Sequence, residues 1–113
     1  MTTSYSKFMA PTVLTASAAT MFTVPVIPAS TLFRGGRMRY TNTTAAATTV
    51  TVYAVPFGGA AALGNCILFA KTIAANDYLD FDLSILGAGD FYQALSGIAS
   101  SVTATMLAGS YFS

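Results

Sequence analysis

The chain has 113 residues, of which 8% are charged and 54% are hydrophobic, and its formal net charge is +1. It has no His, no Trp and no Glu, which removes most of the usual general acids and bases and predicts that the protein is not an enzyme. A small net charge without a basic stripe argues against nucleic-acid binding. Because soluble domains average about 25% charged residues, we expect other copies or partners to cover part of this surface.

Residues with high β-propensity dominate the chain, and turn residues recur every eight to twelve positions, as in an all-β sandwich or barrel. We expect residues 1–10 to form an extended arm and residues 11–113 to form a single domain. In chain order, the expected strands cover residues 13–16, 20–24, 31–42, 48–55, 66–73, 78–83, 91–96 and 102–111. The predicted fold is therefore an antiparallel, jelly-roll-like β-sandwich of about eight strands.

Alternating residue types indicate which side of each strand faces the core. In 48–55 the side chains of Val50, Val52 and Ala54 point one way, and in 78–83 Asp80 and Asp82 point outward. A glycine pair at 35–36 predicts a β-bulge. The aromatic residues that we expect in the core are Phe22, Phe33, Tyr53, Phe69 and Phe81.

The sequence predicts no catalytic residues, no cofactor and no metal site. Asp77, Asp80 and Asp82 could offer oxygen ligands to calcium, but their spacing matches no known calcium-binding loop. The single cysteine, Cys66, excludes an internal disulfide, and we expect it to be a buried apolar filler. Proline and glycine interrupt each long uncharged window, so we expect no membrane-spanning helix and no membrane partner.

Two groups of residues are candidates for an interface. The first is the arginine cluster of Arg34, Arg37 and Arg39, which either pairs with Asp80 and Asp82 in the same subunit or contacts a neighbour. The second group consists of residues near the two termini that are hard to place in a core, namely Tyr5, Phe8, Met9, Tyr111 and Phe112. Ordered aromatic residues at chain ends suggest docking onto a neighbouring subunit.

Three segments, taken in order, resemble small phage virion structural proteins. They read VLTASAATMFTVP, RMRYTNTTAAATTVTVYAVPFGG and NCILFAKTIAANDYLDFDLSILGAGDFYQA, and the resemblance covers residues 13 to 95. It implies a β-sandwich subunit, often trimeric, that is encoded among head and tail genes. The sequence departs from the pattern at the Gly35-Gly36 pair and in the apolar arm, and the pattern carries no catalytic residues.

The resemblance implies a capsid decoration (cement) protein that is made in the host cytoplasm and stabilises the virion shell by bridging major capsid subunits. The expected partners are copies of the chain, with a trimer favoured, and the major capsid protein or other virion proteins. A neck, tail, baseplate or head-fibre component is an alternative within the same class. A carbohydrate-binding module that stacks sugars on Tyr53 or Tyr92 is an alternative from another class.

Overall fold

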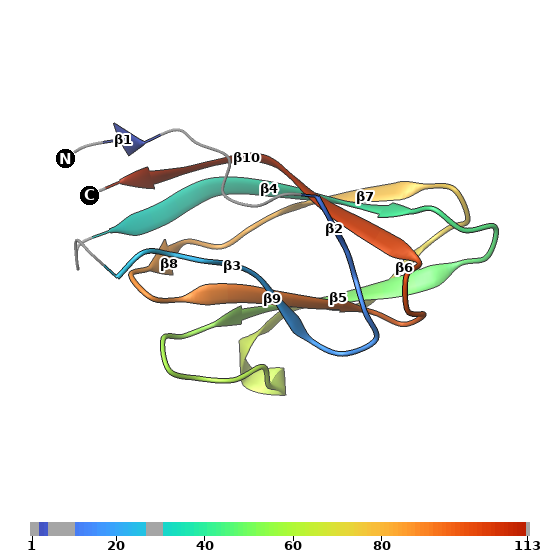
Figure 1. The fold of residues 1–113 in the computed structure, drawn as a ribbon, viewed down its shortest axis with the longest axis horizontal. Coiled ribbons are helices and arrows are strands. Elements are labelled where there is room, and N and C mark those ends of the chain that lie inside the picture. The colour runs from blue at the N-terminus through green and yellow to red at the C-terminus, as the bar shows by residue number, and fades with distance from the viewer. Residues whose placement is uncertain (1–2, 5–10, 27–30, 113) are drawn as a thin grey trace.

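The computed structural model describes residues 3–4, 11–26 and 31–112, and this part of the chain is all-β (Figure 1). One short 3-10 helix, η1 (Leu63–Asn65), interrupts the strands. The strands are β1 (Thr3–Ser4), β2 (Thr12–Val13), β3 (Ala19–Thr23), β4 (Leu32–Asn42), β5 (Thr48–Val55), β6 (Cys66–Ile73), β7 (Tyr78–Asp82), β8 (Leu86–Gly87), β9 (Phe91–Ser96) and β10 (Val102–Phe112).

The strands form two antiparallel sheets that pack face to face, as Figure 1 shows. Sheet A has the order β1-β10-β4-β7, with β2 also on β10 and β8 also on β4, and sheet B has the order β3-β9-β5-β6. If β7 and β8 are counted as one interrupted strand and β1 as an addition, eight strands remain. Numbered one to eight along the chain, these strands place numbers 1, 8, 3 and 6 (β2, β10, β4 and β7) in sheet A and numbers 2, 7, 4 and 5 (β3, β9, β5 and β6) in sheet B. This strand order is that of a jelly roll. The predicted fold class is confirmed.

The core lies between the sheets and is built around an aromatic cluster. The ring centroid of Phe22 lies 4.9 Å from that of Phe33 and 5.2 Å from that of Tyr92, in tilted arrangements that favour aromatic pairs. Phe81 packs at the edge of this core.

Three core predictions fail in part. Phe69 is 69% exposed, so its core assignment is wrong: β6 is an edge strand, and two register shifts against β5 disrupt its alternation at this point. Tyr53 is half-buried and faces away from the core, because its neighbours Val52 and Ala54 point inward. Cys66 is half-buried rather than buried.

Two β-bulges that compensate each other interrupt the pairing of β4 with β10. Met106 pairs with Met38 and Ala108 with Arg37, so β10 carries one extra residue there. Ser110 then pairs with Arg34, so β4 carries one extra residue in its turn. That residue belongs to the Gly35-Gly36 pair, where the prediction of a bulge is confirmed, and Gly35 has a φ of 71°. The pairing beyond the two bulges returns to its original register.

A buried asparagine organises the turns at the end of the sandwich where β4 leads into β5 and β6 into β7. Asn42 is 1% exposed, and its side-chain Nδ2 donates to the carbonyl oxygens of Ala46, Ile73 and Ala74 at 2.8 to 3.1 Å. Its Oδ1 accepts from the backbone N–H of Thr44 at 3.0 Å and from the Thr44 hydroxyl at 2.7 Å. One side chain therefore replaces backbone partners that two turns lack.

At the opposite end of the sandwich, the side chain of Asp90 likewise binds backbone groups of two separate segments of the chain. Its Oδ1 accepts from the backbone N–H of Phe57 and its Oδ2 from that of Gly87, both at 2.9 Å. Its backbone oxygen accepts from Val24 at 2.9 Å. The carboxylate therefore joins the end of β5 to β8.

The hydroxyl of Tyr40 is buried and has no hydrogen-bond partner among the residues that the structure describes. Tyr92, in contrast, donates its hydroxyl hydrogen to the backbone oxygen of Ser84, and burial raises its pKa to about 12. We therefore expect Tyr40→Phe to raise the free energy of unfolding by about 1 kcal/mol, because it removes an unpaired buried polar group. Tyr92→Phe, the matched control, should lower it. Chemical denaturation measures both, and a loss in Tyr40→Phe would contradict the expectation.

Candidate functional site

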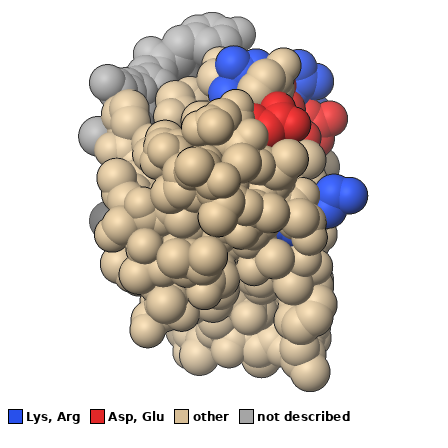
Figure 2. All heavy atoms as spheres, turned by 90° about the vertical axis from the view of Figure 1, so that its right-hand side faces the viewer, with Lys and Arg blue, Asp and Glu red and all other residues tan. Residues whose placement is uncertain are grey.

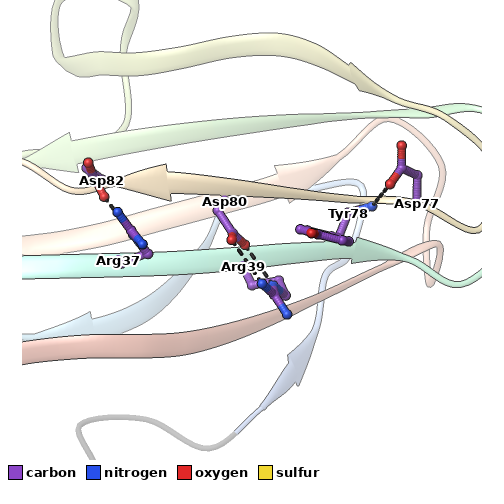
Figure 3. Close-up of polar contacts among 6 residues, drawn as sticks. All are labelled: Arg37, Arg39, Asp77, Tyr78, Asp80 and Asp82. Carbon is purple, nitrogen blue, oxygen red and sulfur yellow. Dashed lines mark hydrogen bonds and ion pairs between the residues drawn. The ribbon is translucent and has the colours of Figure 1, made fainter.

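The charged side chains of β4 and β7 form a short ladder on the outer face of sheet A. The Nε of Arg37 lies 3.0 Å from the Oδ1 of Asp82. Arg39 binds Asp80 through two hydrogen bonds, Nε to Oδ1 at 2.7 Å and Nη2 to Oδ2 at 2.9 Å. Figure 3 shows both pairs reaching across the two strands. The register explains the contacts, because Arg37 is directly opposite Asp82 and Arg39 directly opposite Asp80.

Of the two arrangements that the sequence left open, the structure therefore shows Arg37 and Arg39 paired with aspartates of the same chain. The guanidinium of Arg39 also lies over the ring of Tyr78, 4.2 Å from its centroid. The hydrogen bonds from Arg39 lower the pKa of the Asp80 carboxyl below its ordinary value. The contact with Asp80 raises the pKa of Arg39 in turn, so the pair stays fully charged at neutral pH.

The two pairs differ in how much bonding capacity they leave for a neighbour. Arg39 and Asp80 satisfy each other on both oxygens, with side chains 39% and 30% exposed. Arg37 and Asp82 share one contact and are 54% and 76% exposed. Such an exposed pair contributes little to stability, and it can still add specificity at the rim of an interface.

An open groove of about 570 Å³ lies beside the Arg37–Asp82 pair, at the two bulges. Its lining is partly apolar and includes Leu83, Ala108 and Leu107, the last of which is 46% exposed. Gly36 forms part of its lining, and a Cβ at this position would meet the Phe33 ring at 2.6 Å. The ionisable side chains among its lining residues are Arg37 and Asp82, which bind each other.

Of the remaining predicted interface residues, some lie on strands of sheet A and others lie outside the part of the chain that the structure describes. Tyr5, Phe8 and Met9 lie outside the described residues. Tyr111 and Phe112 belong to β10, where their backbones pair with β4 on one side and with β1 on the other. Arg34 is exposed on β4, at the end of the bulge, and is directly opposite Ser110. The short strands β1 and β2 both pair with β10 of the same chain.

Sequence reasoning missed several exposed apolar side chains that lie far from the arginine cluster. Phe57 is 72% exposed and Leu63 is 80% exposed, both in the connection between β5 and β6. Because this connection is rich in glycine and alanine, it reads as an ordinary loop, and its lack of charge was the available signal. Figure 2 shows that most of the charge in that view gathers in the upper part of the molecule, with one basic side chain at mid-height on the right edge, while the lowest part is uncharged.

Other kinds of site find little support in the described residues. There, no three acidic, histidine or cysteine side chains come close enough together to hold a metal ion. Within the same part of the chain, no helix has the length and apolar character to cross a membrane. Of the two stacking residues predicted for a carbohydrate-binding module, Tyr92 is fully buried in the core, so its assignment is wrong, while Tyr53 is half-buried and faces away from the core.

Comparisons with known proteins add little. The chain matches no family model, and no curated protein matches its sequence. Among solved structures, it is similar to a chain of the "Structure of infectious bursal disease virus Gx strain", with a TM-score of 0.40 and 13% sequence identity. The match covers 97% of this chain and 30% of that chain, so the chain spans less than a third of its neighbour's length. A similarity this low carries no functional argument.

Proposed function

We propose that the chain is a non-enzymatic structural protein of a phage virion, and specifically a capsid decoration protein that bridges neighbouring major capsid subunits as a homotrimer. The observation that carries the proposal is the apolar, charge-poor exposed surface. Ten large apolar or aromatic side chains of the described residues are 41 to 80% exposed, while only 8% of the whole chain is charged. Such a surface is typical of a subunit that is covered in its assembly.

An apolar, charge-poor surface is suited to binding a capsid shell, because the shell offers many identical copies of one contact. Each apolar square ångström removed from water stabilises the contact by roughly 25 cal/mol, and repetition over many copies adds avidity without new chemistry. The Thr- and Ala-rich segments lose little side-chain entropy on burial, so they cost little to order against a neighbour. The jelly roll is compatible with this role, but the fold alone does not assign it.

The arm is the part of the proposal that is easiest to test. Deletion of residues 1–10 removes β1, whose described residues form the pairs Thr3–Phe112 and Ser4–Tyr111, and we expect the melting temperature to fall by no more than a few degrees. We expect attachment to purified particles that lack the protein to be abolished, as measured by co-sedimentation. A chain shortened by residues 1–2 alone serves as the control and should attach.

The outcomes separate the two parts of the proposal. Unchanged attachment of the chain that lacks residues 1–10 would contradict the role of the arm. Failure of the full chain to sediment with any particle of its virus would contradict the assignment as a virion protein.

A further inference from the structure

The outer face of sheet B is made of uncharged residues. Its side chains come from three strands: Thr20 and Thr23, on either side of a bulge in β3, Phe91, Gln93 and Leu95 on β9, and Thr49, Thr51, Tyr53 and Val55 on β5. Thr51 and Val55 are already buried within the chain, so the open part of the face comes from the other seven residues. Register aligns them in rows, with Thr20 opposite Gln93 and Gln93 opposite Tyr53. We call these nine residues the neutral face.

The charges nearest to the neutral face do not belong to it. Lys71 on the edge strand β6 is directly opposite Val50, whose side chain points into the core, so Lys71 is out of phase with the outer rows. The carboxylate of Asp90 binds the backbone N–H groups of Phe57 and Gly87. Sheet A differs sharply, because its outer face carries two ion pairs on β4 and β7.

A ridge stands beside the neutral face. The connection between β5 and β6, residues 56–65, lies on the outer side of sheet B, away from sheet A (Figure 1). It contains no charged residue, and it carries the exposed side chains of Phe57 and Leu63. Val55 is fully buried although it is not part of the core cluster, which indicates that this connection covers the end of β5. The face therefore has a raised half near β5 and β6 and a lower half on β3 and β9.

We propose that the chain associates with a second copy of itself through the neutral face and the ridge. Charge is the first argument: a partner with charged residues at this contact would lose their hydration without gaining a counter-charge. A second copy brings the same uncharged surface, so pairing desolvates no ion. Shape is the second argument, because a two-fold rotation places the ridge of each copy over the lower half of the other, which makes the surface self-complementary.

The available area is sufficient for a specific contact. Three strands about 5 Å apart and about 20 Å long present roughly 300 Å² of face. Phe57 and Leu63 add roughly 250 Å² when they are covered. Two copies would therefore remove about 1,100 Å² from water in total, which exceeds the roughly 1,000 Å² expected of a biological interface.

The proposal goes beyond the proposed function, because a two-fold contact joins chains in pairs and a trimer needs a separate three-fold contact, and solution mass tests it. We expect the full chain at about 100 μM to elute above the monomer mass, by light scattering after size exclusion, at both low and high salt. High salt should not dissociate it, because no ion pair holds the contact. Gln93→Lys at the centre of the face and Leu63→Asp on the ridge should each weaken association at least tenfold.

Matched controls keep the test specific. Thr105→Lys lies on the outer face of sheet A, opposite Arg39, and should leave the mass unchanged. Leu63 lies in an exposed connection, so Leu63→Asp should fold even if Gln93→Lys does not, and circular dichroism checks both. A monomeric wild-type chain, or an oligomer that survives both variants, would overturn the proposal. Co-sedimentation separates it from the proposed function, since a monomer that still attaches to particles refutes only the self-association.

Discussion

Asn42→Ala should lower the free energy of unfolding by about 4 kcal/mol, the largest loss expected for any single amide in the described residues. The side chain is 1% exposed and serves three backbone carbonyl oxygens and the N–H and hydroxyl groups of Thr44. Removal of the amide takes five hydrogen bonds away from a buried side chain, and of the groups left behind the Thr44 hydroxyl and the Ala46 oxygen keep a contact with each other, at 3.0 Å. For a chain of this length, the melting temperature should fall by about 15 °C.

Two further variants make the Asn42 result interpretable. Thr43→Ala changes the exposed neighbouring residue and should alter stability by no more than about 0.5 kcal/mol. Asn42→Asp keeps the size and the acceptor oxygen but loses the donor, so it should also destabilise the fold, and most strongly once the carboxyl ionises. If denaturant unfolding shows Asn42→Ala to be as stable as Thr43→Ala, the proposed role of Asn42 in the two turns is wrong.

Gly36→Ala should cost about 3 kcal/mol, because the new methyl group collides with the core. A Cβ at Gly36 would lie 2.6 Å from Cε2 and 2.7 Å from Cζ of Phe33, and 3.2 Å from the Cβ of Leu83. The Phe33 ring cannot move aside, since it is fully buried and packs against Phe22 and Tyr92. Thermal unfolding followed by near-ultraviolet circular dichroism would report both the lost stability and the disturbed aromatic packing.

The preceding residue, Gly35, gives a matched control, because it has room for a side chain but a backbone conformation that favours glycine. Nothing lies within 4 Å of a Cβ built there, but its φ of 71° favours glycine or asparagine. Gly35→Asn should therefore change stability by less than about 1 kcal/mol. Equal losses in Gly36→Ala and Gly35→Asn would show that backbone conformation, rather than contact with Phe33, determines the need for glycine here.

Local patterns were sufficient to predict most of the fold. The residue ranges predicted for β5, β6 and β9 match the structure, because alternation and flanking turn residues define each strand without reference to its neighbours. The glycine pair predicted the bulge in β4, since a glycine pair inside a strand marks such irregularities. The partner bulge at Leu107 has no comparable signal in the sequence.

What the sequence could not predict depends on pairing between distant segments. Arg39 and Asp80 are 41 positions apart, and only the register of β4 against β7 brings them together. The exposure of Phe69 follows from the position of β6 at a sheet edge and from its irregular register against β5. Alternation within one strand contains no information about either property.

The matched bulges of β4 and β10 link the lengths of two segments that lie about 70 residues apart in the chain. A single extra residue in one strand moves the pairing of every following residue by one position, and the original register returns only if the other strand gains a residue as well. Insertions and deletions around the glycine pair and around Leu107 should therefore be inherited together. Related chains should carry either both irregularities or neither, although no contact between these residues is needed to enforce the rule.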